Sequence, residues 1–237
     1  MHEEFFDIYD EELNPIGIAS RREAHANGYW HRTFHCWLAR RSDGRELVLF
    51  QRRQLGKDTN PGCYDITAAG HLLAGEGLSD AVRELKEELG VSVSLQELIY
   101  LDQVREEADG LVDGKPFIDR EVSDVYGLIT SIPLESLVLQ QEEVAGVYEA
   151  EISDMLALFR GERDSLTVSG IEHADVTADS AGKSDNGNDL AENNSGLAGH
   201  PSEYKLVSRM MTAGQFVPRP FSYYINVLEK LQDCIKG

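Results

Sequence analysis

Residues 70–91 read GHLLAGEGLSDAVRELKEELGV, and this stretch carries most of the information about the fold. Its apolar positions recur at intervals of three and four residues, which predicts a helix with one face on a core. Gly90 stands where a left-handed C-cap would end such a helix. Glycines in residues 70–77 allow the backbone to approach a ligand closely. The apolar positions are Ala81, Val82, Leu85 and Leu89.

The polar face of this predicted helix concentrates negative charge. Glu84, Glu87 and Glu88 stand at i, i+3 and i+4, so their Cβ atoms lie roughly 5–6 Å apart on one surface. Like charges at this spacing repel each other and raise the carboxylate pKa values unless a cation lies among them. Arg83, four residues before Glu87, offsets part of this repulsion. A hard divalent cation with oxygen ligands, Mg²⁺ above all, would remove most of it.

The segment RELKEEL also has a simpler interpretation, because on its own it is typical of a solvated helix face with paired charges. The positions of Gly70, Glu76 and Gly90 favour the metal site, since the whole stretch resembles the Nudix box. That motif reads Gly, five residues, Glu, seven residues, then Arg-Glu-apolar-any-Glu-Glu-any-Gly-apolar. Every fixed residue type is present. Only six residues, 77–82, separate Glu76 from Arg83, one fewer than in the motif.

The resemblance implies the Nudix fold, an α/β architecture in which a mixed β-sheet is sandwiched between α-helices (α/β/α). It assigns Gly70, Glu76 and Gly90 a structural role in the motif. It further implies that Mg²⁺, with Mn²⁺ as the alternative, is held by box carboxylates, a backbone carbonyl and one glutamate from outside the box. The implied metal ligands are Glu84, Glu87, Glu88, Ala69 and Glu121. The implied catalytic residues are Glu87, Glu88, Glu121 and Arg83.

A second resemblance extends outside the box. Residues 31–76, HRTFHCWLARRSDGRELVLFQRRQLGKDTNPGCYDITAAGHLLAGE, look like the corresponding part of type I isopentenyl diphosphate isomerases, which share the Nudix fold. In those enzymes a cysteine before the box does acid-base work, and its position falls on Ala69, which cannot transfer a proton. Cys63 lies six residues too early to replace it. Metal-binding histidines and two glutamates of the isomerases are matched by His25, His31, His71, Asp119 and Glu121.

Basic residues complete the predicted site. Arg53 and Lys57 resemble the isomerase residues that hold the diphosphate, and a basic pair in an acidic protein can neutralise substrate charge. Together with His71 they are the predicted substrate-binding residues. The alternative for Arg53 and Lys57 is ordinary surface charge beside a strand, and for each histidine a hydrogen-bonded packing role.

Composition narrows the classes of partner. The chain has 237 residues, a net charge of −20 and three cysteines. This charge argues against a surface for polymeric nucleic acid, and the odd cysteine count fits reduced thiols in a cytoplasmic protein. The acidic N-terminal residues contain no apolar run long enough for a signal peptide or a membrane span. A small diphosphate compound is the expected partner, and a homodimer is possible.

The order of predicted elements gives the domain organisation. Strands are predicted over 33–39, 46–51, 64–69, 98–104, 121–129 and 146–151, and helices over 152–160, 204–212 and 222–235. Residues 1–29 are predicted as an N-terminal β-hairpin extension and 30–165 as the Nudix domain. Residues 166–203, poor in large apolar side chains, are predicted as a disordered, low-complexity insertion. Residues 204–237 are predicted as C-terminal helices that pack on the domain.

The function that these patterns favour is Mg²⁺-dependent hydrolysis of a diphosphate bond in a small substrate of the nucleoside diphosphate type. Two alternatives stay open. An isopentenyl diphosphate isomerase-like activity is opposed by Ala69. A non-catalytic ligand sensor on the same fold would be expected to have lost box carboxylates, and Glu84, Glu87 and Glu88 are all present.

Overall fold

The computed structural model describes residues 3–112, 114–174 and 204–236. Its helices are α1 (Arg21–Asn27), α2 (Leu78–Ala81), α3 (Arg83–Leu89), α4 (Ile152–Phe159) and α5 (Phe221–Lys236), with short 3-10 turns at Leu95–Glu97, Leu134–Ser136 and Ala213–Gln215. Its strands are β1 (Phe5–Tyr9), β2 (Pro15–Ser20), β3 (His31–Ser42), β4 (Arg45–Arg53), β5 (Tyr64–Asp65), β6 (Ala68–His71), β7 (Ile99–Val112), β8 (Lys115–Ile129), β9 (Val144–Glu151), β10 (Leu166–His173) and β11 (Tyr204–Met211).

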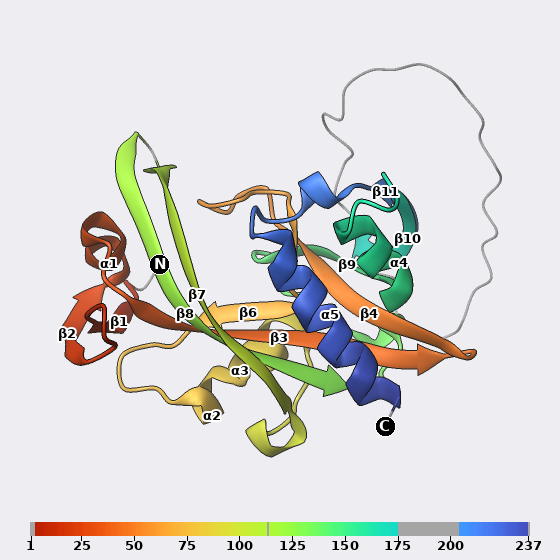
Figure 1. The fold of residues 1–237 in the computed structure, drawn as a ribbon, viewed down its shortest axis with the longest axis horizontal. Helices are drawn as coiled ribbons and strands as arrows, with labels where there is room; N and C mark the ends of the chain where they lie inside the picture. The colour runs from red at the N-terminus through yellow and green to blue at the C-terminus, as the bar shows by residue number, and fades with distance from the viewer. Residues whose placement is uncertain (1–2, 113, 175–203, 237) are drawn as a thin grey trace.

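A mixed sheet forms the centre of the molecule (Figure 1). Its strands follow the order β11-β10-β9-β4-β3-β8-β7, with β5 beside β4 and β6 beside β3. The pairing of β3 with β8 is parallel, whereas β3 pairs antiparallel with both β4 and β6. Two helical layers cover the sheet, so the prediction of a mixed sheet between helices is confirmed.

Each face of the sheet has its own apolar core. Alternate side chains of a strand point to opposite faces, and β3 divides accordingly. Trp37 belongs to the core that α4 and α5 cover, while Leu38 belongs to the core that includes Leu85 and Leu89 of α3. All four side chains are fully buried. The long helix α5 crosses the front of the sheet in Figure 1. The apolar stripe of the box helix is therefore its core face, as the sequence predicts.

The N-terminal residues form a small unit of their own. Strands β1 and β2 pair antiparallel, and the hairpin leads directly into α1. Ser20 caps this helix, since its side chain accepts a hydrogen bond from the Glu23 backbone while Glu23 bonds back. Gly28 closes the helix in the left-handed conformation at φ 65°. Helix α1 lies beside β8 (Figure 1), and this brings His25 to the end of the central sheet.

Two predictions for the C-terminal part are wrong. Residues 204–212, predicted as a helix, form strand β11, and residues 166–173, assigned to the disordered insertion, form strand β10. The two strands pair antiparallel along their full length, and β10 also pairs with β9. Partners this distant in sequence cannot be read from local periodicity, because pairing and burial override local propensity. The remainder of the predicted insertion, 175–203, lies outside the described residues.

Strand boundaries near the box differ in detail from the prediction. Residues 64–69, predicted as one strand, divide into β5 and β6. The first pairs with β4 and the second with β3. Thr67 lies between them, and its hydroxyl donates to the Leu49 carbonyl and accepts from the Leu38 backbone N–H. The chain thus moves from one neighbour to the next and delivers residues 68–71 to the edge of β3.

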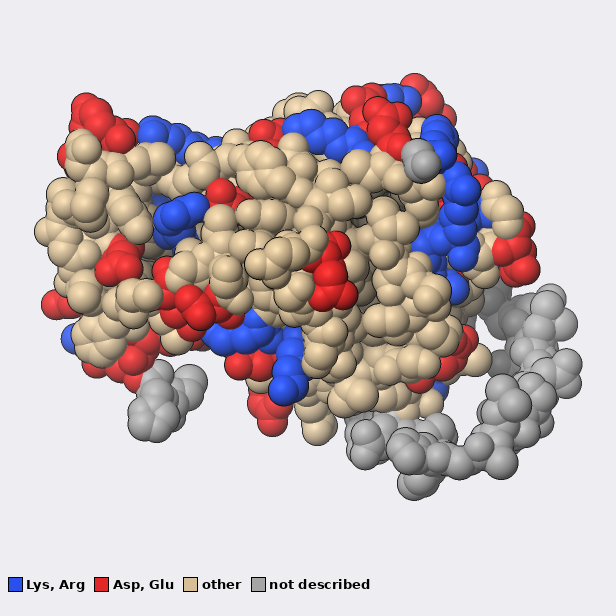
Figure 2. Space-filling model, turned by 90° about the horizontal axis from the view of Figure 1, so that it is seen from below, with Lys and Arg blue, Asp and Glu red and all other residues tan. Residues whose placement is uncertain are grey.

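Charges of both signs are mixed on the surface. Figure 2 shows Lys and Arg side chains in small groups among Asp and Glu on the face that it presents. Arg40 and Glu149 form an ion pair at 2.7 Å. Across the part of the chain that the structure describes, no helix has both the length and the apolar character needed to span a bilayer.

Candidate active site and metal centre

One cavity of about 230 Å³ collects nearly all the predicted site residues. Apart from Ala69 and Gly70, every lining residue carries a polar or charged side chain. The acidic part of the lining is Glu4, Glu84, Glu87, Glu88, Asp119, Glu121 and Glu143. The basic part is Arg21, Arg53, Lys57, Arg83 and Arg219. Carboxylates that can hold a cation therefore share one space with cations that can hold an anion.

The box glycine allows the helix to approach the sheet closely. A Cβ atom on Gly70 would lie 2.2 Å from Cδ of Glu84, far inside van der Waals contact. Only glycine therefore lets the Glu84 carboxylate lie against β6. At the other end of α3, Gly90 adopts φ 72°, and its backbone N–H bonds to the Leu85 and Lys86 carbonyls. Gly70 thus allows α3 to lie close to β6, and Gly90 fixes where α3 ends.

Arg83 connects the loop of the box to its helix. Its guanidinium donates to both carboxylate oxygens of Glu76, at 3.1 and 3.3 Å. It also donates to Glu84 at 2.7 Å and to Glu87 at 3.0 Å. Glu76 in turn accepts from the Leu73 backbone N–H. The shorter spacing between Glu76 and Arg83 therefore does not prevent their contact, although one residue fewer separates them than in the motif.

Burial changes the acidity of two box carboxylates. Glu88 is 6% exposed, and burial, with a smaller contribution from the charge of Glu84, raises its pKa to about 8. Burial likewise raises the pKa of Glu84 to about 7, against the opposing influence of Arg83. Both groups gain most from a nearby cation, because a cation favours the charged form that burial disfavours.

Ala69 takes part in the site through its backbone. Its N–H donates to Glu88 Oε2 at 3.3 Å. A strand residue exposes its N–H and C=O on the same edge, so the Ala69 carbonyl lies on the edge of β6 that faces α3. The carbonyl oxygen and the Glu88 carboxylate are therefore on the same side. This arrangement suits the backbone ligand that the sequence analysis expects.

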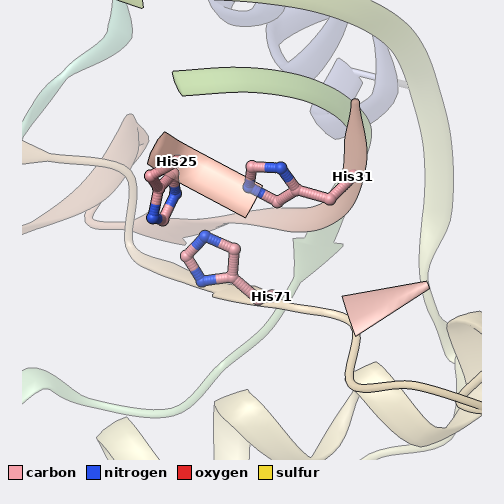
Figure 3. A group of neighbouring side chains, drawn as sticks. All are labelled: His25, His31 and His71. Carbon is pink, nitrogen blue, oxygen red and sulfur yellow. The ribbon is translucent and has the colours of Figure 1, made fainter. Parts of the chain in front are cut away.

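A second group of possible ligands lies at the ends of three neighbouring strands. Parallel pairing sets His31 of β3 opposite Glu121 of β8, and antiparallel pairing sets Thr33 opposite His71 of β6. His25 arrives from α1. Figure 3 shows the three imidazole rings turned toward a common point. One ring nitrogen from each of the three histidines lies within 4.8 Å of the others. The same holds for a ring nitrogen of His31 and one carboxylate oxygen each of Asp119 and Glu121.

The polar atoms of this cluster face each other without hydrogen bonds. The Nε2 atoms of His25, His31 and His71 and Oδ1 of Asp119 are buried and unpartnered. His31 Nδ1 contacts the Tyr29 carbonyl at 3.0 Å. Since a carbonyl only accepts, Nδ1 carries the proton and Nε2 of the neutral ring presents a lone pair. Burial lowers the pKa of His31, which keeps the ring neutral. Lone pairs facing a carboxylate fit a divalent cation.

His71 is tied to Arg21 as well. Arg21 Nη1 donates to His71 Nδ1 at 3.2 Å, so the neutral ring carries its proton on Nε2, 3.3 Å from Glu121 Oε1. Burial, and then the charge of Arg21, hold the pKa of His71 well below its usual value. Ligation through Nε2 would therefore require the Arg21 contact to be released. In this state the His71 Nε2–H is placed to donate to Glu121, and it offers no lone pair to a metal ion.

The predicted substrate-binding cations line the same cavity. Arg53 donates to Asp65 at 3.3 Å and to the Thr59 carbonyl at 3.0 Å, which fixes its guanidinium. Lys57 contacts Glu143, and burial lowers its pKa. Neither side chain is a freely solvated surface charge. Both are placed to meet an anion in the cavity.

The sequence comparisons agree with this geometry. The family model of the NUDIX domain matches residues 29–161. An uncharacterized Nudix hydrolase of Clostridium acetobutylicum is 37% identical over 233 residues, which cover 98% of this chain and 99% of that protein. The chain belongs to the Nudix family.

Other Nudix relatives match over shorter regions. Nudix hydrolase 3 of Arabidopsis thaliana is 38% identical over 151 residues, 62% of this chain and 19% of that protein. An isopentenyl-diphosphate Delta-isomerase of Streptomyces griseus is 41% identical over 91 residues, 38% of this chain and 45% of that protein. The chain thus aligns with less than half the length of either protein. The relatives include both Nudix hydrolases and an isopentenyl-diphosphate isomerase, so both predicted resemblances are confirmed.

Some residues of the cavity come from outside the region that the Nudix model matches. Glu4 and Arg21 precede it, and Arg219 follows it by 58 positions. Arg21, Arg219 and His35 were not predicted as site residues, although all three line the cavity. His35 also lies close to Glu106 and Glu121. The only local signal for Arg219 is its place between two prolines. Nothing local indicates which surface it meets.

The cysteines of this Nudix protein lie away from the cavity. Cys63, the nearest in sequence to the box, is half-buried, and its carbonyl accepts from the Arg53 backbone. Cys36 is fully buried in β3, where burial raises the pKa of its thiol strongly. Neither belongs to the cavity lining. No thiol among the described lining residues takes the place of the side chain that Ala69 lacks.

Proposed function

We propose that the protein hydrolyses a diphosphate bond in a small substrate of the nucleoside diphosphate type, with Mg²⁺ or Mn²⁺. Membership of the Nudix family implies diphosphate hydrolysis as the general reaction. The observation that carries the proposal to this chain is the cavity itself, where Glu84, Glu87 and Glu88 face Arg53 and Lys57 across one space. Carboxylates for a cation and cations for a diphosphate are both required for this chemistry.

The box residues have distinct parts in this proposal. Glu84, Glu88 and the Ala69 carbonyl hold one cation at the edge of β6, and Glu87, which is half exposed, completes the ligand set from the solvent side. Arg83 keeps Glu84 and Glu87 in place through its hydrogen bonds. Arg53 and Lys57 bind the non-bridging oxygens of the diphosphate, because their charge and position match an anion.

Hydrolysis forms one bond from the water oxygen to phosphorus and breaks the bridging P–O bond, so that two phosphate-bearing products leave. When bound, a divalent cation neutralises the diphosphate and orients water. The water proton needs an acceptor, and this part falls to Glu121, a carboxylate outside the box that lines the cavity. His71 Nε2, which carries the ring proton, lies 3.3 Å from its Oε1 and helps to orient it.

The histidine cluster adds a second metal centre to the proposal. His25, His31 and His71 with Asp119 and Glu121 would hold a divalent transition metal better than Mg²⁺, because imidazole ligands suit Fe²⁺ or Zn²⁺ and the two carboxylates suit Mn²⁺. The cluster shares Glu121 with the water-activating role. Its support is the set of buried, unpartnered Nε2 and Oδ1 atoms.

The test is a metal-dependent activity screen on the purified chain. Nucleoside di- and triphosphates, sugar nucleotides, dinucleotides and isopentenyl diphosphate are incubated with Mg²⁺, Mn²⁺ or EDTA, and products are identified by ³¹P NMR. The proposal expects cleavage at a P–O–P bridge that EDTA abolishes. Metal-independent cleavage, or cleavage of none of these compounds with either metal, contradicts it.

The isomerase is the second candidate, and the five-residue cluster of His25, His31, His71, Asp119 and Glu121 is the observation in its favour, because the resemblance assigned these positions to the isomerase metal. Against it, Ala69 offers no side chain for proton transfer. The screen separates the two, since an isomerase would move the double bond of isopentenyl diphosphate and exchange its protons in D₂O while leaving the diphosphate intact. A non-catalytic sensor would bind one of the compounds and change none.

A further inference from the structure

The C-terminal segment supplies the cavity with a rigidly held arginine. Arg219 stands between Pro218 and Pro220, which restrict the backbone on both sides. The Val217 backbone N–H bonds to the Tyr64 carbonyl at 2.9 Å, and this attaches the segment to β5. The Arg219 side chain is 12% exposed and lines the cavity. Its guanidinium lies 5.5 Å from the centre of the Tyr223 ring.

Two carboxylates behind the cavity wall hold this guanidinium. Arg219 Nη1 donates to Asp65 Oδ1 at 2.6 Å, and its Nε lies 2.8 Å from Glu106 Oε1. Asp65 also accepts from Arg53. The four groups form a chain of two cations and two carboxylates, and a carboxylate oxygen of Glu121 also lies within 4.8 Å of Glu106 and His35. A further phosphate would therefore find no excess positive charge here.

His35 presents a hydrogen-bond donor beside Arg219. The Trp37 indole N–H donates to the Tyr223 hydroxyl at 3.2 Å. Among the described residues, His35 Nδ1 at 3.0 Å is the acceptor that the structure gives to the Tyr223 O–H. The neutral His35 ring then carries its proton on Nε2, which points toward Glu106 at 4.0 Å and the cavity. Helix α5, through Tyr223, therefore sets the direction of this donor.

A hydrocarbon fits this end of the cavity poorly. It would remove water from Arg219, His35 and the Thr33 hydroxyl, all lining residues, without replacing any hydrogen bond. Hydroxyl groups fit it well, because each can donate to a carboxylate and accept from a guanidinium or an imidazole N–H. Because positive charge is not in excess here, the matching group is neutral and polar.

We infer that Arg219 and His35 form the specificity-determining end of the cavity and select a diphosphate whose attached group carries hydroxyls over one whose attached group is a hydrocarbon. The inference rests on the proposed function for the position of the diphosphate, which that function assigns to Arg53 and Lys57. It assigns to residues outside the box the choice between sugar-bearing and isoprenoid substrates.

The test measures binding and hydrolysis separately. Binding is followed by calorimetry with methylene-bridged analogues of ADP-ribose and of isopentenyl diphosphate, in which carbon replaces the bridging oxygen and prevents cleavage. ADP-ribose carries a sugar on each side of its diphosphate, so either orientation brings hydroxyls to Arg219. The wild-type chain is expected to bind the ADP-ribose analogue at least 10-fold more tightly than the isopentenyl analogue.

The variant pairs Arg219→Met with Glu106→Gln, because removing the arginine alone would leave Glu106 buried and unpaired. Asp65 keeps Arg53 as its partner in this double variant. Affinity for the ADP-ribose analogue is expected to fall at least 10-fold, while that for the isopentenyl analogue changes less than 3-fold. Arg40→Met, which breaks the Arg40–Glu149 pair outside the cavity lining, is the matched control and should leave both affinities unchanged.

Two results would overturn the inference: wild-type preference for the isopentenyl analogue, or an equal loss of both affinities in the folded double variant. The proposed function has its own readout. If the ADP-ribose analogue binds through Arg219 but no natural diphosphate is cleaved, hydrolysis is wrong and the specificity assignment stands. If diphosphates are cleaved and the double variant lowers turnover of all equally, the specificity assignment is wrong and hydrolysis stands.

Discussion

The backbone N–H of Ala69 lies 3.3 Å from Oε2 of Glu88 and donates a hydrogen bond to it. The same oxygen accepts from Gln51 Nε2 at 3.2 Å. Glu88 of the box helix is therefore held by the backbone of Ala69 in β6 and by the side chain of Gln51 in β4. These contacts fix a buried carboxylate. Among the described residues no cation lies at hydrogen-bond distance from it, and the first two predictions depend on its burial.

Replacement of Glu88 by Gln is expected to lower turnover by about 10²-fold or more, because it removes a ligand's charge from the metal site while keeping its shape. The measurement is steady-state hydrolysis with Mg²⁺ on whichever substrate the screen identifies. Glu97→Gln is the matched control, since Glu97 lies in the short turn Leu95–Glu97 and outside the cavity. Unchanged turnover in a folded Glu88→Gln variant would refute the role of the box.

The stability of the metal-free protein should fall as pH rises from about 4.5 to about 8. Glu88 titrates near 4.5 when unfolded, whereas burial raises its pKa to about 8 in the folded state. The folded state thus binds the proton more tightly, and this contribution to stability is complete below pH 4.5 and lost as pH approaches 8. Glu84, whose pKa burial raises to about 7, acts in the same direction.

Thermal unfolding in EDTA at pH 6 and pH 8 measures this effect. The wild-type Tm should drop by several °C more than that of Glu88→Gln, which has no carboxyl group to titrate at this position. Mg²⁺ at pH 8 should raise the wild-type Tm and shift that of the variant less. Equal pH dependence in the two proteins would mean that Glu88 is not the titrating group.

Gly70→Ala tests the close approach of the box helix to β6. The new Cβ would lie 2.2 Å from Cδ of Glu84, so the carboxylate must move away from the cavity. We expect turnover to fall at least 10-fold and Mg²⁺ affinity to weaken, while the fold remains, since α3 keeps its apolar contacts. Gly214→Ala is the control, because nothing lies within 4 Å of its added Cβ. Equal behaviour of the two variants would contradict the steric argument.

Metal content tests the histidine cluster. His31→Gln removes a buried Nε2 that faces Asp119 at 3.5 Å and should lower the Mn²⁺ bound per chain by about one ion. Binding can be measured by elemental analysis after dialysis and by electron paramagnetic resonance titration. His173→Gln on β10, outside the cavity lining, should retain the wild-type stoichiometry. The same stoichiometry in both variants would exclude the cluster as a site for the added Mn²⁺.

Local pattern carried much of the fold. The stripe of Leu85 and Leu89 predicted the core face of α3 because a helix repeats every 3.6 residues whatever surrounds it. The box spacing identified Arg83 and Glu76. In the structure these two side chains form hydrogen bonds although one residue fewer separates them than in the motif. Strand β11 was missed, since its sequence has helical periodicity and only its pairing with β10 decides its conformation.

The candidate site divides in the same way. Glu84, Glu87 and Glu88 could be predicted as one group because a single helix carries them. His25, His31 and His71 could be proposed only from resemblance, since they come from α1, β3 and β6, and strand register brings two of them to the same end of the sheet. Arg219 could not be predicted at all, because its partners Asp65 and Glu106 are more than 100 positions away in the chain.

The sequence by itself determined the Nudix family, the box helix, the carboxylates on its polar face and the lack of a thiol at position 69. These features depend on the order of neighbouring residues, and neighbouring residues share an element. Tertiary structure alone decided which histidines converge, that Glu88 is buried, and that the part of the cavity beside Arg219 is polar without excess positive charge. Those properties arise from strand pairing and packing between segments far apart in the chain, where burial and the proximity of charges set affinity and acidity.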